Sequence, residues 1–156
     1  MVEQKYIDKV FDSLSSMDLQ LDPNPLEFGP SVLNEKTATV RRFLSSTERL
    51  FMEISQNLHK YKRDLLLKQS QHKISLDRLI AEDPHVRSGR SEREREALAG
   101  QRLTLLTDEI NKLTISVSDL DDLLKVVKAK RSDLKDIQNR IRDQLKLCQE
   151  QIALGQ

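Results

Sequence analysis

The chain has 156 residues and one cysteine, carries a formal net charge of +1, and is 33% charged but only 4% aromatic. A chain of this length suits one domain, and so few aromatic residues leave little material for a thick, layered core. The single cysteine, Cys148, excludes an intrachain disulfide and a cysteine-based zinc site. Leu, Ile and Val supply most of the apolar content, which favours narrow seams between helices over stacked sheets.

The chain also lacks the signals of membrane insertion and secretion. No stretch reaches the roughly 18 apolar residues of a membrane span. Residues 1–20 contain Glu3, Asp8 and Asp12 and lack the basic and apolar regions of a signal peptide. We therefore expect a soluble, intracellular protein without a membrane partner.

The first expected element is an amphipathic helix within residues 1–20. Its apolar residues recur at helical spacing and are Tyr6, Ile7, Val10, Phe11, Leu14 and Met17. A helix of about four turns is marginal alone, so it should dock on its own chain or on a neighbouring copy. Residues 21–30 should form a linker, because three prolines and a glycine preclude regular structure there.

A long second helix is expected from Ser31, which suits the N-cap position. Its seam residues recur in steps of four and three and are Leu33, Thr37, Val40, Leu44, Thr47, Phe51, Ile54, Leu58, Tyr61 and Leu65. The polar residues Lys68 and His72 then interrupt the series before it resumes at Leu79. We interpret this interruption as a slip of phase, because no helix breaker occurs before Pro84.

The tip of a hairpin is expected at residues 83–91, where Asp-Pro ends one helix and Ser-Gly permits a reversal. Ser91 and Glu94 form a capping box for a third helix, which begins at about Ser91. No Pro or Gly interrupts residues 101–154. The seam residues of this helix are Ala99, Leu103, Leu106, Ile110, Leu113, Val117, Leu120, Leu124, Val127, Arg131, Leu134, Gln138, Ile141, Leu145, Cys148 and Ile152. A repeat of 3.5 residues over about seven heptads is typical of a coiled coil.

The two seams predict an all-α fold, in which residues 31–156 form a long antiparallel helical hairpin. In the expected register Leu65 lies near Leu113 and Phe51 lies near Val127. The charges agree with that register, because residues 57–78 hold six bases and two acids while residues 103–124 hold five acids and one base. Opposite charges would thus face each other across the hairpin.

A flank of apolar residues lies beside the seams. Its members on the third helix that we assign to an oligomer or partner contact are Leu105, Ile115, Leu123, Val126 and Ile137. Leu66, Leu67, Ile74 and Leu147 are similarly left over. Unpaired apolar surface of this kind predicts a homo-oligomer or a partner helix.

Enzymatic chemistry finds little support in the sequence. The three histidines stand 13 residues apart and form no helical metal-binding pair. The segment 87–90 has one glycine and no following Lys-Ser/Thr, so it is not a phosphate-cradling loop. We expect a protein that is not an enzyme and has no metal, no cofactor and no small-molecule substrate.

Binding of nucleic acid has more support. The candidate phosphate contacts at the tip are Arg87, Arg90, Arg93 and Arg95, beside the amides of a helix N-terminus. A basic strip along the second helix adds Lys60, Lys62, Arg63, Lys68 and Lys73. Single strands prefer a basic track with aromatic platforms, and only Tyr61 lies in this strip. The alternative is a solvated, salt-bridged loop, since Glu92, Glu94 and Glu96 also lie at the tip.

The order of these elements resembles that of the phage recombination mediators of the UvsY type. An acidic N-terminal segment, a long basic helix, a mid-chain interruption and a terminal helix follow one another, and the stretch 108–113 leading into 123–127 is similar to the terminal helical region of that family. The resemblance implies a non-enzymatic oligomer of the host cytoplasm that binds single-stranded DNA. It implies a recombinase or a single-strand-binding protein as a further partner.

Two other classes of protein fit the same sequence. One is an architectural or virion-associated coiled-coil protein, and the other is an adaptor or inhibitor that docks on another protein through its helical flank. A salt-sensitive affinity for single-stranded DNA would separate the mediator from both.

Overall fold

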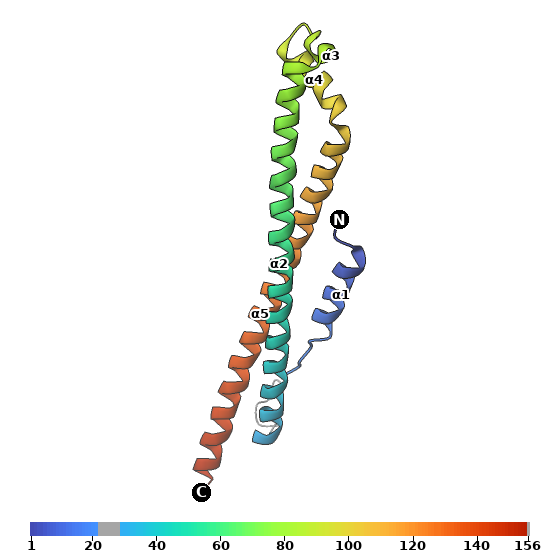
Figure 1. The fold of residues 1–156 in the computed structure, drawn as a ribbon. Coiled ribbons are helices and arrows are strands. Elements are labelled where there is room, and N and C mark those ends of the chain that lie inside the picture. The colour runs from blue at the N-terminus through green and yellow to red at the C-terminus, as the bar shows by residue number, and fades with distance from the viewer. Residues whose placement is uncertain (22–28, 156) are drawn as a thin grey trace. The chain divides into compact units, whose positions relative to one another are not determined.

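The computed structural model describes residues 1–21 and 29–155, and every regular element in them is a helix. The elements are α1 (Gln4–Ser15), α2 (Pro30–Glu82), α3 (Pro84–Arg87), α4 (Glu92–Arg102) and α5 (Thr104–Leu154) (Figure 1). Helix α2 packs against α5 in the opposite direction, so the predicted all-α helical hairpin is confirmed. Most of the predicted linker, residues 22–28, lies outside the described residues.

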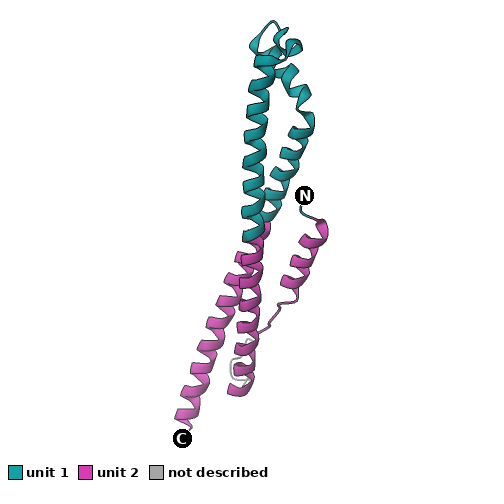
Figure 2. Cartoon of the chain, viewed as in Figure 1, with its two compact units in different colours: residues 1–2, 56–121 teal, residues 3–55, 122–156 magenta. Residues whose placement is uncertain are grey.

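The chain divides into two compact units, and each long helix contributes a part to both (Figure 2). Unit 1 comprises residues 1–2 and 56–121, and unit 2 comprises residues 3–55 and 122–156. Unit 1 therefore contains the tip with α3 and α4, whereas unit 2 contains α1.

The core of unit 2 forms where the first part of α2 packs on the second part of α5. Its buried cluster consists of Leu33, Val40, Ile141 and Cys148, against which Leu19 and Leu21 pack. Helix α1 buries Val10 and Leu14. Leu19 and Leu21, in the segment that follows α1, thus lie against the hairpin in unit 2.

Pairs of side chains across α2 and α5 confirm the predicted register. In unit 1, His72 Nε2 lies 3.5 Å from Thr107 Oγ1, and Lys68 Nζ lies 2.6 Å from a carboxylate oxygen of Glu109. In unit 2, an Arg131 guanidinium nitrogen lies 2.8 Å from a Glu48 carboxylate oxygen. The polar residues Lys68 and His72 thus face α5 and pair with polar groups on it.

Three helix boundaries differ from the sequence prediction. Helix α2 begins at Pro30 and not after Ser31, because proline's missing N–H and fixed φ suit the first helical turn. The tip contains the one-turn helix α3, which the Asp-Pro signal did not reveal. The third helix is broken at Leu103, where the amide donates to the Gly100 carbonyl at 3.1 Å and the Thr104 hydroxyl donates to the Gln101 carbonyl at 2.9 Å.

The predicted apolar flank requires a correction. Leu123 is buried, with 3% of its surface exposed, and Ile137 packs against the core cluster of unit 2. Val126 is half-buried. Ile137 shares the core of unit 2 with Leu19 and Leu21, which follow α1, so α5 buries residues there beside the two-helix seam. Leu105 and Ile115 of the flank remain exposed, both in unit 1.

Candidate nucleic-acid interface

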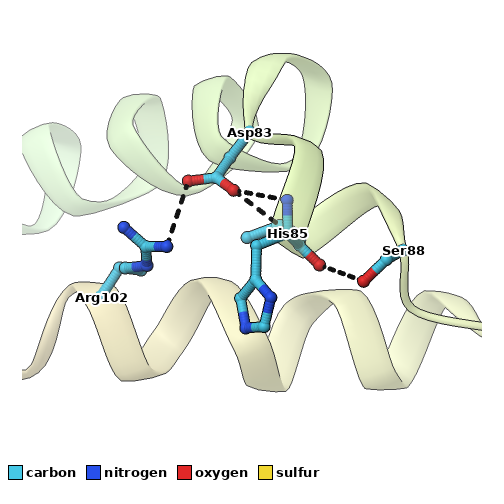
Figure 3. Close-up of polar contacts among 5 residues, drawn as sticks. Asp83, His85, Ser88 and Arg102 are labelled. Atoms are coloured by element: carbon cyan, nitrogen blue, oxygen red, sulfur yellow. Dashed lines mark hydrogen bonds and ion pairs between the residues drawn. The ribbon is translucent and has the colours of Figure 1, made fainter.

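The tip of unit 1 is organised by Asp83, which caps α3 (Figure 3). Its Oδ1 accepts hydrogen bonds from the amides of His85 at 2.8 Å and Val86 at 3.2 Å, and its Oδ2 lies 3.8 Å from the Arg102 guanidinium. The hydrogen bonds from Val86 and His85, with the charge of Arg102, hold the pKa of Asp83 below its ordinary value and outweigh the opposing effect of burial. A carboxylate with a lowered pKa stabilises the tip at neutral pH, and this stabilisation is lost as the pH falls below the ordinary aspartate range.

Arg95 belongs to the internal structure of the tip. Its Nε donates to the Gly89 carbonyl at 3.2 Å, and the side chain is half-buried. A Cβ at Gly89 would lie 2.8 Å from Arg95 Cγ. Glycine at position 89 therefore allows the Arg95 side chain to pass this close to the backbone. Arg95 was predicted as a phosphate contact, and the hydrogen bond to Gly89 engages one of its donors.

The N-terminus of α4 is occupied by its own residues. Ser91 Oγ accepts from the Glu94 amide at 3.1 Å, which confirms Ser91 as the N-cap. The Glu94 carboxylate accepts from the amide of Arg90 at 2.8 Å, and not from that of Ser91 as a reciprocal capping box would have it. With Glu92 also in the first turn, an incoming phosphate would meet acids at this helix end.

The basic strip on α2 is partly neutralised by acids of α5. Lys62 Nζ lies 3.6 Å from Asp121 Oδ1, and Lys68 pairs with Glu109. These are the contacts that the facing charge blocks predicted. Two cations of the strip are therefore engaged within unit 1.

Seven of the nine predicted cations are exposed, and one of these, Lys62, pairs with Asp121. The other six form no ion pair with any residue in 1–21 or 29–155, and they are Lys60, Arg63, Lys73, Arg87, Arg90 and Arg93. Three lie on α2 and three lie at the tip or on α4. We call this set the free cations of unit 1. Their helix positions were predictable, whereas their freedom from acids depends on which faces of α5 and α4 carry the carboxylates.

Unit 1 also exposes apolar side chains. Within residues 56–121 five are each more than half exposed, and they are Leu66, Leu67, Ile74, Leu105 and Ile115. We call them the apolar set of unit 1. A hollow of about 390 Å³ lies between α2 and α5 beside one of them, Leu67, and is also lined by Met1, Gln71 and Leu113 together with charged residues of both helices. The amide of Val2 donates to Ser116 Oγ at 3.1 Å and so attaches the start of the chain to α5.

Two features of the sequence were interpreted incompletely. Asp83 before Pro84 was taken as a helix end, although an acid followed by proline is also a strong signal for a helix start. The bond from Val2 to Ser116 has no local signal in the sequence, because it joins positions 114 residues apart.

Among the described residues, no group of three His, Cys, Asp or Glu side chains is arranged to hold a metal ion, and no helix is both long and apolar enough to cross a bilayer. The fold and the interface thus define the chain as a helical hairpin with a mixed basic and apolar surface on unit 1. No family model matches the sequence, and no curated protein or solved structure is significantly similar to it.

Proposed function

We propose that this protein is a non-enzymatic, self-associating helical protein that binds single-stranded DNA and assists the loading of a recombinase. The observation that carries the proposal is the set of free cations of unit 1, whose exposed charges attract phosphates whatever the base sequence. Assistance to a recombinase, and displacement of a single-strand-binding protein, rest on the resemblance to mediators of the UvsY type.

Binding by this surface would be mainly electrostatic. Tyr61, the one aromatic residue in the basic strip, is half-buried on α2, so it offers no open platform for stacking a base. The affinity should therefore fall steeply with salt and depend little on base composition. Each phosphate contact with a single strand contributes about 0.7 to the slope of log affinity against log salt.

The test is fluorescence anisotropy of a labelled oligo-dT across a salt series. Arg87→Gln with Arg90→Gln removes two free cations and should lower the salt slope by about 1.4. The matched control is Lys62→Gln with Arg78→Gln, which removes two charges from unit 1 that already pair with Asp121 and Glu82. The control should change the slope by less than half as much. Absence of binding by the unaltered protein at low salt would show that the mediator function is wrong.

A second candidate function is favoured by the apolar set of unit 1. Five large apolar side chains are exposed on the 66 residues of helical hairpin in unit 1. Exposed apolar surface of this extent is uncommon in a protein that acts as a monomer. In this function the protein is an architectural coiled-coil component, or an adaptor that docks on another protein. Self-association without affinity for oligonucleotides would support it over the mediator.

A further inference from the structure

A polar hollow of about 430 Å³ lies between α2 and α5 in unit 2, and none of its lining residues was assigned above to nucleic acid. Apart from one leucine, its lining residues are Asn34, Thr37 and Arg41 of α2 and Gln138, Asn139 and Arg142 of α5. The lining thus offers two guanidinium groups and four neutral polar side chains. No carboxylate is among the lining residues that belong to 1–21 and 29–155.

The two arginines of this hollow are not paired with an acid in the described part of the chain. Neither Arg41 nor Arg142 forms an ion pair within the described parts of the chain, and both are exposed. Their like charges border one hollow from two helices. A phosphate held there would receive charge-assisted hydrogen bonds from both, in the fork geometry for which arginine is suited.

The positive surface continues along α2. Arg41 also borders a second hollow of about 390 Å³, whose other lining residues are Arg42, Ser45, Ser46 and Arg49. Among the described residues, this lining again contains no carboxylate. Arg49 lies eight positions after Arg41 on the α-helix, which is about 12 Å along the helix axis. One isolated phosphate ion would use only one hollow, whereas a strand with successive phosphates can contact both.

We propose that Arg41 and Arg142, with Arg42 and Arg49 beside them, bind the phosphate backbone of a single-stranded nucleic acid. This site in unit 2 goes beyond the proposed function, which rests on the free cations of unit 1. The amide groups of Asn34, Gln138 and Asn139 supply hydrogen bonds to phosphate and sugar oxygens, whereas the Thr37 hydroxyl already donates to the Leu33 carbonyl at 2.9 Å. The site reads no base sequence, because it offers contacts to the backbone alone.

The experiment measures the salt dependence of binding of a labelled oligo-dT to the full chain. Arg41→Gln with Arg142→Gln should lower the salt slope by about 1.4, as expected for two lost phosphate contacts. The matched control is Lys135→Gln with Arg140→Gln, which removes two charges from exposed positions of α5 that do not line the hollow. Circular dichroism of both pairs should show unchanged helix content, because all four side chains are exposed.

The results separate this site from the surface of unit 1. A salt slope that is lowered by Arg41→Gln with Arg142→Gln, but not by the control pair, supports the site. This holds even if Arg87→Gln with Arg90→Gln has no effect, in which case the proposed surface on unit 1 is wrong. An unchanged slope for the Arg41 and Arg142 pair overturns the site, whatever the tip pair does. An equal loss in the Lys135 and Arg140 control also overturns it, since net charge would then explain the binding.

Discussion

Leu123 and Leu105 belong to the same helix, α5, and both lie beside the predicted seam, yet their surroundings are opposite. Leu123 has 3% of its surface exposed and Leu105 has 82%. Truncating a buried leucine removes apolar burial and leaves a cavity, which costs about 2–5 kcal/mol, whereas a change at an exposed position usually stays within about 0.5 kcal/mol. We expect Leu123→Ala to lower the free energy of unfolding by that larger amount and Leu105→Ala to leave it nearly unchanged.

Chemical denaturation of the two variants, followed by circular dichroism at one protein concentration, measures this difference. Equal losses for Leu123→Ala and Leu105→Ala would contradict the assignment of Leu123 to the core. The comparison also shows the limit of periodicity at the scale of a residue. Steps of four and three identify the side of α5 that faces α2, but they cannot reveal that unit 2 contains α1 as a third helix.

At the scale of the element, two glycines near the tip differ in what a side chain would meet. A Cβ at Gly89 would lie 2.8 Å from Arg95 Cγ and 3.1 Å from the Arg95 amide nitrogen, whereas a Cβ at Gly100 would have nothing within 4 Å. Gly100 lies inside α4, where alanine is favoured over glycine by about 0.5–1 kcal/mol. We expect Gly100→Ala to stabilise unit 1 by that amount and Gly89→Ala to destabilise it by about 1–3 kcal/mol.

Thermal unfolding of the two variants tests these opposite signs. Each kcal/mol should shift the midpoint by about 2–4 °C in a chain of this size. A lowered midpoint for Gly100→Ala would mean that the break at Leu103 requires glycine three residues earlier. The sequence alone did not predict that break, because no proline or glycine stands at the site. The break arises where the Leu103 amide donates a hydrogen bond to the Gly100 carbonyl and the Thr104 hydroxyl donates one to the Gln101 carbonyl.

The long helices themselves were predictable for a simple physical reason. Apolar side chains at a 3.5-residue spacing must be buried along one line, and blocks of opposite charge then select one register among several. The ion pairs of Lys68 with Glu109 and of Arg131 with Glu48 realise that register. The candidate interface was predictable only in part. The sequence assigns each cation to a helix, but it does not show which acid faces that cation. Lys62 pairs with Asp121, whereas the adjacent Arg63 forms no ion pair with any described residue.

At the scale of the whole molecule, the apolar set of unit 1 bears on how the protein associates. These side chains flank the α2–α5 seam without being covered by it, and their transfer from water is worth about 25 cal/mol per Å² of apolar area. A second copy can cover them, since each copy presents the same set. We therefore expect a concentration-dependent oligomer that weakens when Leu67→Gln, Ile74→Gln and Leu105→Gln are combined.

Sedimentation velocity or light scattering across a range of concentrations measures this association. The matched control is Ile152→Gln with Leu154→Gln, which also removes exposed apolar side chains, but from unit 2. If the triple variant and the control weaken association equally, general hydrophobicity and not the apolar set of unit 1 drives it. A monomer at every concentration of the unaltered protein would contradict self-association, and the exposed leucines and isoleucines would then have to serve a different protein partner.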